Sequence, residues 1–496
     1  MPVVGGVDSS TQATKVELRD LESGSLVGSG RAPHRVTTPP TSEQDPGMWW
    51  DALALAMGEA LAEAASHGVR AADVVALAAA AQQHGLVALD DRGEVIRPAK
   101  LWNDTESAVD SRRLLDRLPP AAWAEACGSV PVAAFTVCKL AWLRRTEPRS
   151  FDRLAHVMLP HDWLTWRLTG ASVTDRGDAS GTGYWSPADD GYRTDLLELV
   201  EDRGDWLSRL PTVHRASAVA GDLLASAAAA LGIPAGIPVA VGTGDNMAGA
   251  LGTGMTTGDV AVSLGTSGTV YALHGEPTHD PSGAVAGFAD ATDRFLPLVC
   301  TLNATLVTDA VARLLSVDRQ ALDGLALAAP PGSDGMVLVP YLAGERTPNR
   351  PGASGSLHGL RPGATPELLA RAAFEGVVCG LLQGRDALSA AGVPPADGRM
   401  IVLGGGARSA AYLEVLAGLS GRPLSVPAIP EPVAKGAGIL AAAAATSSGV
   451  GPVIGAWDSE VWETVDPALG PDQAESIRIR YAGTVAQVGG GDASDP

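Results

Sequence analysis

The sequence predicts a duplicated α/β fold of two domains, and three observations lead to this prediction. The chain of 496 residues is too long for one ordinary hydrophobic core. Strand-like and helix-like stretches alternate along it. An apolar strand, a turn of small hydroxyl-bearing residues and a second strand occur twice, over residues 3–18 and 260–273. One such β-hairpin at the start of each half predicts a domain boundary near residue 248.

Hydrophobic periodicity predicts the individual elements in chain order. Residues 50–65 have the apolar spacing of a helix, and residues 74–81 form an apolar run typical of a buried strand. Residues 400–403 predict a second buried strand, which is followed by a glycine turn. Further helices are predicted over residues 366–390, 410–419 and 471–488. The composition shifts to Ser, Gly and Pro after about residue 445, and we expect residues 489–496 to be a frayed tail.

Composition and charge exclude several classes of function. The formal charge of −20 argues against nucleic acid, although a few local donors could still hold a small phosphorylated ligand. The four cysteines form no C-x-x-C pair, which favours a reducing compartment over a zinc site or a disulfide framework. We find no signal peptide and no apolar run of membrane-spanning length. We therefore expect a cytoplasmic protein with small-molecule partners, with neither nucleic acid nor a membrane among them.

The tips of the two hairpins are the first candidate site. Gly, Ser and Thr let backbone N–H groups and hydroxyls approach a phosphate chain closely. Two tips that face each other across a cleft would clasp a triphosphate, whereas the alternative is a pair of ordinary tight hairpins. Asp8 at the first tip would then hold Mg²⁺ through water, because this ion prefers carboxylate and water oxygens.

Asp245 is the second candidate, in a run of small residues after the apolar stretch 238–241. A carboxylate at a strand-to-helix turn is open to a ligand, and one base near a hydroxyl is what phosphoryl transfer to an alcohol requires. The alternative is an ordinary helix N-cap, since the oxygens of Asp accept free backbone N–H groups there.

Two polar clusters could bind a polyhydroxy ligand. Gln83 and His84 follow the predicted strand 74–81 and offer amide and imidazole donors and acceptors. Trp102, Asn103 and Asp104 add polar groups and an aromatic face some twenty residues later. Polar loops at strand ends without a ligand would give the same pattern.

The glycine run 404–406, between a predicted strand and a predicted helix, is the fourth candidate. Glycines let a planar base lie against the backbone, although packing could equally require them. The sequence has no G-x-x-x-x-G-K-[ST] stretch, no H-R-D or D-F-G motif of protein kinases, and no G-x-G-x-x-G motif with a downstream acid.

Taken together, these motifs resemble the FGGY family of carbohydrate kinases, from residue 8 to about residue 445. The segments that carry the resemblance are DSSTQ (8–12), QHG (83–85), LWND (101–104), GDN (244–246), LGTSGT (264–269), GERTP (344–348) and GGG (404–406). The resemblance implies two ribonuclease-H-like domains of the actin-like ATPase type, with ATP and a sugar in the cleft between them. It divides the chain into a sugar-binding domain with the Mg–phosphate hairpin (1–248), an ATP-binding domain (249–445) and a C-terminal helix with a tail (446–496).

The resemblance also implies roles for individual residues. Asp245 is the expected proton acceptor, and the sugar is expected at Gln83, His84, Trp102, Asn103, Asp104 and Asn246. ATP and its Mg²⁺ are expected at Asp8, Thr11, Gln12, Gly265, Thr266, Gly405 and Ser409. The expected partners are ATP and a small sugar, with a homodimer as the candidate assembly.

The Gln83–His84 pair implies the family members that phosphorylate D-xylulose to D-xylulose 5-phosphate. The chain departs from the family pattern at Ala80 and Ala81, where Ser-Gly is common, and at Glu106, where an Arg is common. A sibling kinase for another ketose or polyol is the first alternative. An actin-like ATPase that serves a protein partner is the second, and Asp245 with Gln83–His84 distinguishes a sugar kinase from it.

Overall fold

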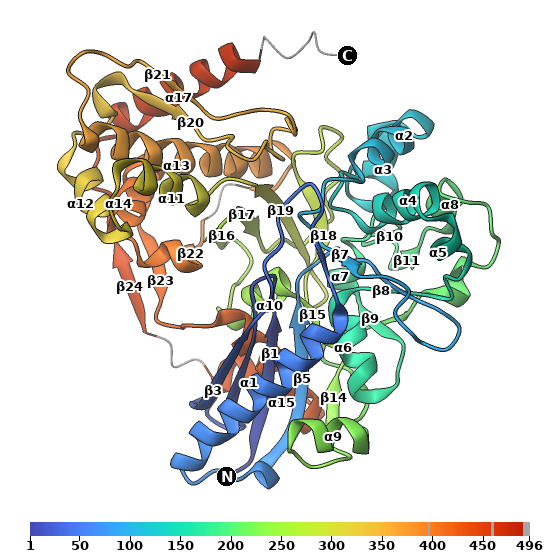
Figure 1. The fold of residues 1–496 in the computed structure, drawn as a ribbon. Coiled ribbons are helices and arrows are strands. Elements are labelled where there is room, and N and C mark those ends of the chain that lie inside the picture. The colour runs from blue at the N-terminus through green and yellow to red at the C-terminus, as the bar shows by residue number, and fades with distance from the viewer. Residues whose placement is uncertain (395–396, 458–460, 490–496) are drawn as a thin grey trace. The chain divides into compact units, whose positions relative to one another are not determined.

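The computed structural model describes residues 1–394, 397–457 and 461–489 (Figure 1). The chain forms two compact units. The first comprises Met1–Met255, His274–Leu296 and Ile429–Glu460, and the second comprises Thr256–Leu273, Pro297–Ala428 and Val461–Pro496. The predicted organisation in two domains is confirmed, while the predicted boundaries at 248 and 445 stay predictions.

The main sheet of the first unit has the strand order β13-β14-β5-β1-β2-β3, and the short strand β15 also pairs with β5. Strands β1 and β2 form the predicted antiparallel hairpin, whereas β5 runs parallel to β1 and to β14. The bounds are β1 Val3–Ser9, β2 Ala13–Asp20, β3 Leu26–Pro33, β5 Val74–Ala81, β13 Val219–Asp222, β14 Pro238–Ala240 and β15 Thr243–Gly244.

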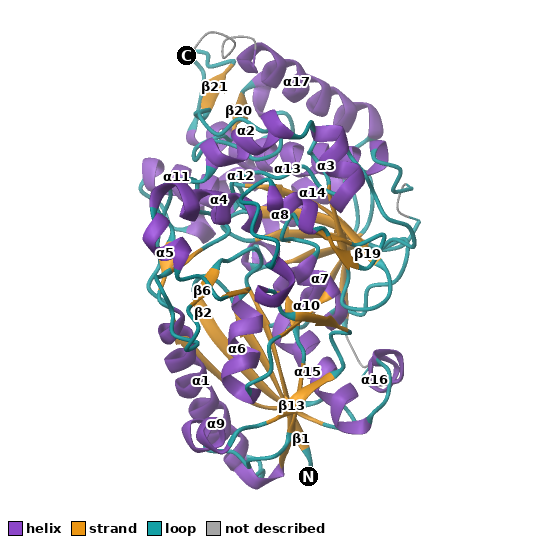
Figure 2. Ribbon diagram, turned by 90° about the vertical axis from the view of Figure 1, so that its right-hand side faces the viewer, coloured by secondary structure: helices purple, strands orange, loops and turns teal. Residues whose placement is uncertain are grey.

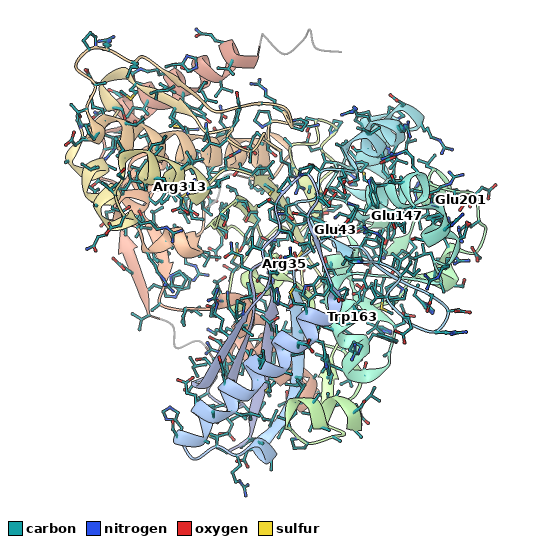
Figure 3. All side chains as sticks on the ribbon, in the orientation of Figure 1. Arg35, Glu43, Glu147, Trp163, Glu201 and Arg313 are labelled. Carbon is teal, nitrogen blue, oxygen red and sulfur yellow. The ribbon has the colours of Figure 1, made fainter. Side chains whose placement is uncertain are left out.

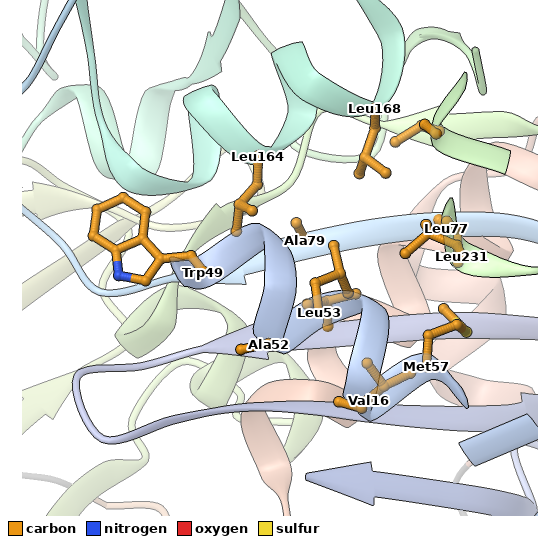
Figure 4. Packing of buried hydrophobic residues seen from close by; sticks show 14 of the residues in the cluster. Val16, Trp49, Ala52, Leu53, Met57, Leu77, Ala79, Leu164, Leu168 and Leu231 are labelled. Atoms are coloured by element: carbon orange, nitrogen blue, oxygen red, sulfur yellow. The ribbon is translucent and has the colours of Figure 1, made fainter. Parts of the chain in front are cut away.

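Helices α1 (Pro46–Ser66) and α15 (Pro432–Thr446) cover the two faces of this sheet (Figure 2). The successive residues Gly5 and Gly6 of β1 point to opposite faces, Gly5 toward Met57 of α1 and Gly6 toward the backbone of α15. On the α1 face, Leu53, Met57 and Leu77 join side chains of α6 (Pro160–Thr169) in one buried core, part of which Figure 4 shows.

The remaining elements of the first unit are short. Its further strands are β4 Glu43–Gln44, β6 Val87–Leu89, β7 Ala99–Lys100, β8 His156–Met158, β9 Val173–Asp175, β10 Trp185–Ser186, β11 Gly191–Tyr192, β12 Thr212–His214 and β18 Ala286–Ala289. Its further helices are α2 Ala108–Arg117, α3 Pro120–Cys127, α4 Thr136–Thr146, α5 Pro148–Asp152, α7 Arg176–Ala179, α8 Thr194–Glu198, α9 Ala225–Leu231, α10 Asp245–Gly252 and α16 Val450–Ala456.

The second unit repeats the strand arrangement of the first. Its order β23-β22-β16-β17-β19 matches β14-β5-β1-β2-β3, and in each series the first two pairings are parallel and the last two are antiparallel. The strands are β16 Val260–Leu264, β17 Gly268–Ala272, β19 Phe295–Thr301, β20 Val337–Val339, β21 Ser356–His358, β22 Met400–Leu403, β23 Leu424–Pro427 and β24 Trp462–Val465. The helices are α11 Thr305–Leu315, α12 Arg319–Ala328, α13 Pro366–Ala390, α14 Ala410–Ser420 and α17 Pro471–Gly489. The repeated topology confirms the predicted duplication.

Several predicted elements are confirmed to within one residue at each end: β5, β22, α13, α14 and α17. Helix α1 begins four residues before the predicted start at residue 50. Asp45 caps it by accepting from the N–H group of Gly47, and Pro46 occupies the first helical position. The predicted tail lies, apart from Gly489, outside the described residues.

Within the described part of the chain, no single helix has both the length and the apolar composition to cross a membrane. Helices α15 and α16 are separated by a sharp bend, and they meet the criteria of length and composition only when they are counted together. Residues Ala434 to Ala444 of α15 are buried against the sheet of the first unit.

Candidate functional site

Three candidate segments of the first unit meet because their strands are parallel neighbours. In the β1–β5 register Asp8 pairs with Ala80 and Ser9 with Ala81, and in the β15–β5 register Thr243 pairs with Ala80. The carboxyl ends of β1, β5 and β15 therefore lie side by side. This is the edge at which α/β sheets bind ligands. Asp8, Gln83 and Asp245 all stand at this edge.

Asp245 is the first residue of α10, and Gly244 occupies the N-cap position. The Asp245 Oδ1 atom accepts hydrogen bonds from the N–H group of Asn246 (2.8 Å) and from Asn246 Nδ2 (3.0 Å). The N-cap interpretation of Asp245 is therefore wrong, because another residue occupies the cap. Its carboxylate instead stands at the positive end of a helix, where negative charge is stabilised.

The pKa of the Asp245 carboxyl group is unusual. Burial raises it to about 7, and the negative charges of Asp8 and Asp178 act in the same direction, while the hydrogen bonds from Asn246 oppose the shift. A carboxylate with such a pKa can both take up and release a proton near neutral pH, as a general base must.

Gln83 and Asn246 connect the ends of β5 and β15. Asn246 Nδ2 donates to Gln83 Oε1 at 2.9 Å, across 163 residues of sequence. Gln83 Nε2 is buried and has no hydrogen-bond partner among the described residues. A buried donor without a partner is costly, so a ligand oxygen is a natural acceptor for it.

His84 is held in an unusual conformation beside Gln83. Its φ of +63° lies in the left-handed region, and its Nδ1 atom contacts the carbonyl oxygen of Gly181 at 2.7 Å. Because a carbonyl only accepts, the Nδ1 atom of His84 carries a proton. The buried Lys139 and Thr136 donate to the carbonyl of His84 at 2.6 and 3.2 Å, and these bonds fix its backbone.

Asp8 is 1% exposed, and both of its carboxylate oxygens have protein partners. Ser10 donates to Oδ1, and Lys15 donates to Oδ2 at 3.1 Å and also to Glu431 at 2.6 Å. Burial lowers the pKa of Lys15, but the negative charges of Asp8 and Glu431 outweigh this effect, so the pKa is raised. Because both carboxylate oxygens of Asp8 already have protein partners, this side chain is better suited to hold Mg²⁺ through water than to coordinate the ion directly.

The first tip also contacts the Trp102 loop. Trp102 Nε1 donates to Thr11 Oγ1 at 2.9 Å, and Thr11 donates to Gln82 at 3.2 Å. Gln12, the next residue of the tip, is exposed. The hydrogen bonds join Trp102 to the edge that carries Asp8 and Gln83.

Asp104 is buried and occupied by protein groups. Lys100 Nζ lies 2.9 Å from Asp104, 3.0 Å from Glu43 and 2.5 Å from Glu106, and it stacks 3.8 Å from the centroid of the Trp142 ring. Although these three carboxylates lie within 4.8 Å of one another, the ammonium group already supplies the cation that such a cluster needs.

Glu106 thus replaces the common Arg with a charge that balances Lys100. Arg97 extends this network between Glu43 (2.6 Å) and Glu147 (3.1 Å), both labelled in Figure 3. The neighbouring Asn103 differs from Asp104, because its Oδ1 atom is buried and has no hydrogen-bond partner among the described residues.

In the second unit, helix α11 supports the other hairpin tip. The N–H groups of Ala304 and Thr305 donate to the carbonyls of Thr266 and Gly265 at 3.1 and 3.0 Å. Glu345, from the GERTP segment, holds the residues before α11 by accepting from the Leu302 N–H group at 2.7 Å. The tip and the helix N-terminus are therefore parts of one rigid arrangement.

The glycine run combines packing and accessibility. Gly404 has a φ of +83°, and a side chain there would meet the carbonyl of Leu264 at 2.7 Å. A side chain at Gly405 would meet no atom within 4 Å, so this glycine is open to a planar base. Ser409 caps α14 by accepting from the Tyr412 N–H group and donates to Asp323 at 2.8 Å.

The residues that hold the candidate groups in place were not predicted from the sequence. Lys15 pairs with Asp8 and with Glu431, 416 residues away, and His161 lies within a group of buried acids behind Asp245. The sequence did carry a signal for Lys15, because pairing in the predicted hairpin places this charged residue opposite Asp8. His161 carried none, because a single buried histidine has no distinctive spacing.

Two family models match this chain. The N-terminal domain of the FGGY family of carbohydrate kinases matches residues 3–252, and the C-terminal domain of the same family matches residues 260–445. Together they cover more than half of the chain.

Curated relatives and solved structures agree with these matches. A xylulose kinase of Streptomyces coelicolor is 46% identical over 481 residues, covering 96% of this chain and 95% of that protein. One of Streptomyces rubiginosus is also 46% identical, covering 98% and 96%. The crystal structure of xylulose kinase from Bifidobacterium adolescentis is 37% identical, with a TM-score of 0.80, and covers 98% of this chain and 99% of that one.

Proposed function

The chain belongs to the FGGY family of carbohydrate kinases, and on that premise we propose that it transfers the γ-phosphoryl group of ATP to D-xylulose, giving ADP and D-xylulose 5-phosphate. The observation that carries the proposal is the meeting of Asp245, Gln83 and Asn246 at the carboxyl ends of β5 and β15. The names of the two Streptomyces relatives support the choice of sugar.

Asp245 accepts the proton of the terminal sugar hydroxyl as that oxygen attacks the γ-phosphorus atom. Gln83, His84, Asn246 and the Trp102–Asn103 loop bind and orient the sugar, and the contact of Nδ1 with the Gly181 carbonyl holds the ring of His84 in place. Asp104 acts through the loop, since its carboxylate is bound to Lys100.

The two hairpin tips bind the phosphates of ATP. Thr11 and Gln12 contribute from the first tip and Gly265 and Thr266 from the second, while Gly405 and Ser409 lie at the adenosine. Asp8 orients the water shell of the Mg²⁺ that accompanies ATP, and Lys15 keeps its carboxylate in place. When bound, Mg²⁺ neutralises charge on the transferred phosphoryl group.

Three further assignments belong to the same proposal. The protein is cytoplasmic, the nucleotide enters as its Mg²⁺ complex, and the assembly is a homodimer. Light scattering coupled to size exclusion at working concentration measures the mass, and a mass near 50.5 kDa would show a monomer instead.

Release of ADP, measured by a coupled assay, tests the sugar. D-Xylulose, D-ribulose, L-xylulose, glycerol and gluconate should be compared at equal concentrations. We expect the highest kcat/KM for D-xylulose, at least tenfold above that for each other compound. A higher value for any of them would favour a sibling kinase.

Replacing His84 should weaken sugar binding. In His84→Ala we expect the KM for D-xylulose to rise about 10-fold, equivalent to about 1.4 kcal/mol, because a hydrogen bond and a ring contact are lost. The KM for ATP should stay within 2-fold. Asn tolerates the left-handed backbone conformation better than Ala does, so His84→Asn separates an effect on sugar binding from an effect on folding. His67→Ala, at an exposed helix end, is the matched control. An unchanged sugar KM would remove His84 from the site.

The pH profile should report the proton acceptor. Asp245 accepts a proton only when ionised, so kcat/KM for D-xylulose should fall as pH drops below about 7, in keeping with the pKa raised to about 7 by burial. An ordinary carboxyl group would place this fall near pH 4. A profile that stays flat down to pH 5 would speak against Asp245 as the acceptor.

A further inference from the structure

A buried polar cluster lies directly behind the segment that carries Asp245. His161 of α6 is completely buried, and its Nδ1 atom contacts Asp178 at 2.8 Å. On the other side its Nε2 atom lies 3.2 Å from Asp162 and 3.8 Å from Asp175. Three acids around one imidazole form a costly arrangement in a core, and such arrangements often serve function rather than stability.

The cluster is linked to the Asp245 segment by contacts on Val241, Gly242 and Thr243. Thr165 of α6 donates to the carbonyl of Val241 at 3.1 Å. A side chain at Gly242 would meet the His161 ring at 3.3 Å, so the ring lies beside this residue. Thr243 donates through Oγ1 to Asp175 Oδ2 at 2.8 Å. The path from the cluster to Asp245 therefore passes through Thr243.

Helix α7 completes the link from the other side. Asp175 caps it by accepting from the N–H groups of Gly177 (2.9 Å) and Asp178 (3.0 Å). A side chain at Gly177 would meet Met247 at 3.0 Å and Thr243 Oγ1 at 3.1 Å, which shows that α7 packs against both flanks of Asp245. Asp178 Oδ1 is buried and has no hydrogen-bond partner among the described residues.

The charges that surround Asp245 can be assigned element by element. Asp8 on β1 is paired with Lys15 of β2, which also binds Glu431 just before α15. Gln83, which lies just after β5 at this edge, contributes a neutral amide. α6 and α7 contribute His161, Asp162 and Asp178, with Asp175 at the end of β9. Although burial opposes it, the charges of these acids raise the pKa of His161 above its usual range.

We infer that Asp245 is oriented by a support made of four residues, Thr243, Asp175, His161 and Asp178. The negative charge of Asp178 also favours the protonated form of Asp245, so this carboxylate can hold the proton that it removes from the sugar. We assign these four as positioning residues, which act on the sugar only through Asp245. The inference rests on the proposed role of Asp245 as the base.

The geometric half of the inference is tested at Thr243. Thr243→Val keeps the shape but removes the bond to Asp175, and we expect kcat to fall about 10-fold while the KM for D-xylulose changes less than 2-fold. Thr243→Ser keeps the hydroxyl and should return kcat to within 3-fold of wild type. A Thr243→Val enzyme with wild-type kcat, or one that Thr243→Ser fails to restore, would overturn this half.

The electrostatic half is tested at Asp178, with Asp162 as the matched control. Removing the charge in Asp178→Asn should move the acidic fall of kcat/KM to lower pH, by roughly half a unit or more, because a like charge near Asp245 is lost. Asp162→Asn changes the same cluster on the far side of His161 and should leave the fall in place. An unmoved profile in Asp178→Asn, or an equal shift in Asp162→Asn, would overturn the assignment of Asp178.

These outcomes are separable from a failure of the proposed function. If wild type itself shows no acidic fall near pH 7, then Asp245 is not the base. If wild type shows it and Asp178→Asn does not shift it, then only the support is refuted. Thermal melting of each variant identifies one that does not fold, in which case the Thr243→Val and Thr243→Ser pair decides.

Discussion

Replacing Asp245 with Asn should lower kcat by about 10³-fold, which corresponds to about 4 kcal/mol of transition-state stabilisation. The amide keeps the shape of the carboxylate and its contact with the Asn246 N–H group, but it cannot accept the sugar proton. The coupled assay with saturating ATP and D-xylulose measures the loss. Asp222→Asn, at an exposed end of β13 in the same sheet, should retain full activity.

The same substitution should not destabilise the protein. Since the folded-state pKa of Asp245 lies above the ordinary value of 3.8, ionisation costs stability as pH rises from about 4 to 7. Asp245→Asn removes this cost, so the melting temperature of the variant minus that of wild type should increase steadily as pH rises from about 4 to 7. Turnover close to that of wild type would remove Asp245 from the mechanism, whatever the melting temperature.

Asp8→Asn should have the second largest effect, a fall in kcat/KM for Mg–ATP of about 100-fold. The amide still accepts from Ser10, but it loses the charge that orients the hydrated ion and that Lys15 neutralises. The Lys15 ammonium group would keep Glu431 as its partner, so the hairpin should stay folded.

A Mg²⁺ titration at fixed ATP measures this effect directly. The variant should need a higher Mg²⁺ concentration for half-maximal rate, while the KM for D-xylulose changes little. Asp20→Asn, at the opposite end of the same hairpin, is the control. Wild-type Mg²⁺ dependence in Asp8→Asn would show that the ion is held elsewhere.

The duplicated fold and the main candidates could be predicted because their signals are local. Each hairpin is a contiguous pattern, and β5 is a single apolar run between residues 74 and 81. Parallel pairing of β1, β5 and β15 then brings Asp8, Gln83 and Asp245 together, although the registers themselves could not be read from the sequence.

The supporting interactions could not be predicted, because each joins residues that are distant in the chain. Thr243 and Asp175 are 68 residues apart, and Lys15 and Glu431 are 416 apart. The interpretation of Asp245 as a helix cap failed for a different reason. Asp is favoured at both the cap and the first turn, and only the backbone of Gly244 shows which residue takes which place.

Identification of the product by ³¹P and ¹³C NMR tests the central claim most directly. With ATP, Mg²⁺ and D-xylulose, we expect one phosphate ester, on O5 of the sugar, formed in a 1:1 ratio with ADP. Without sugar, ADP formation should fall to a small fraction of this rate. ADP and inorganic phosphate formed at the same rate with and without sugar would indicate an ATPase. An ester on another oxygen would contradict the placement of the terminal hydroxyl at Asp245.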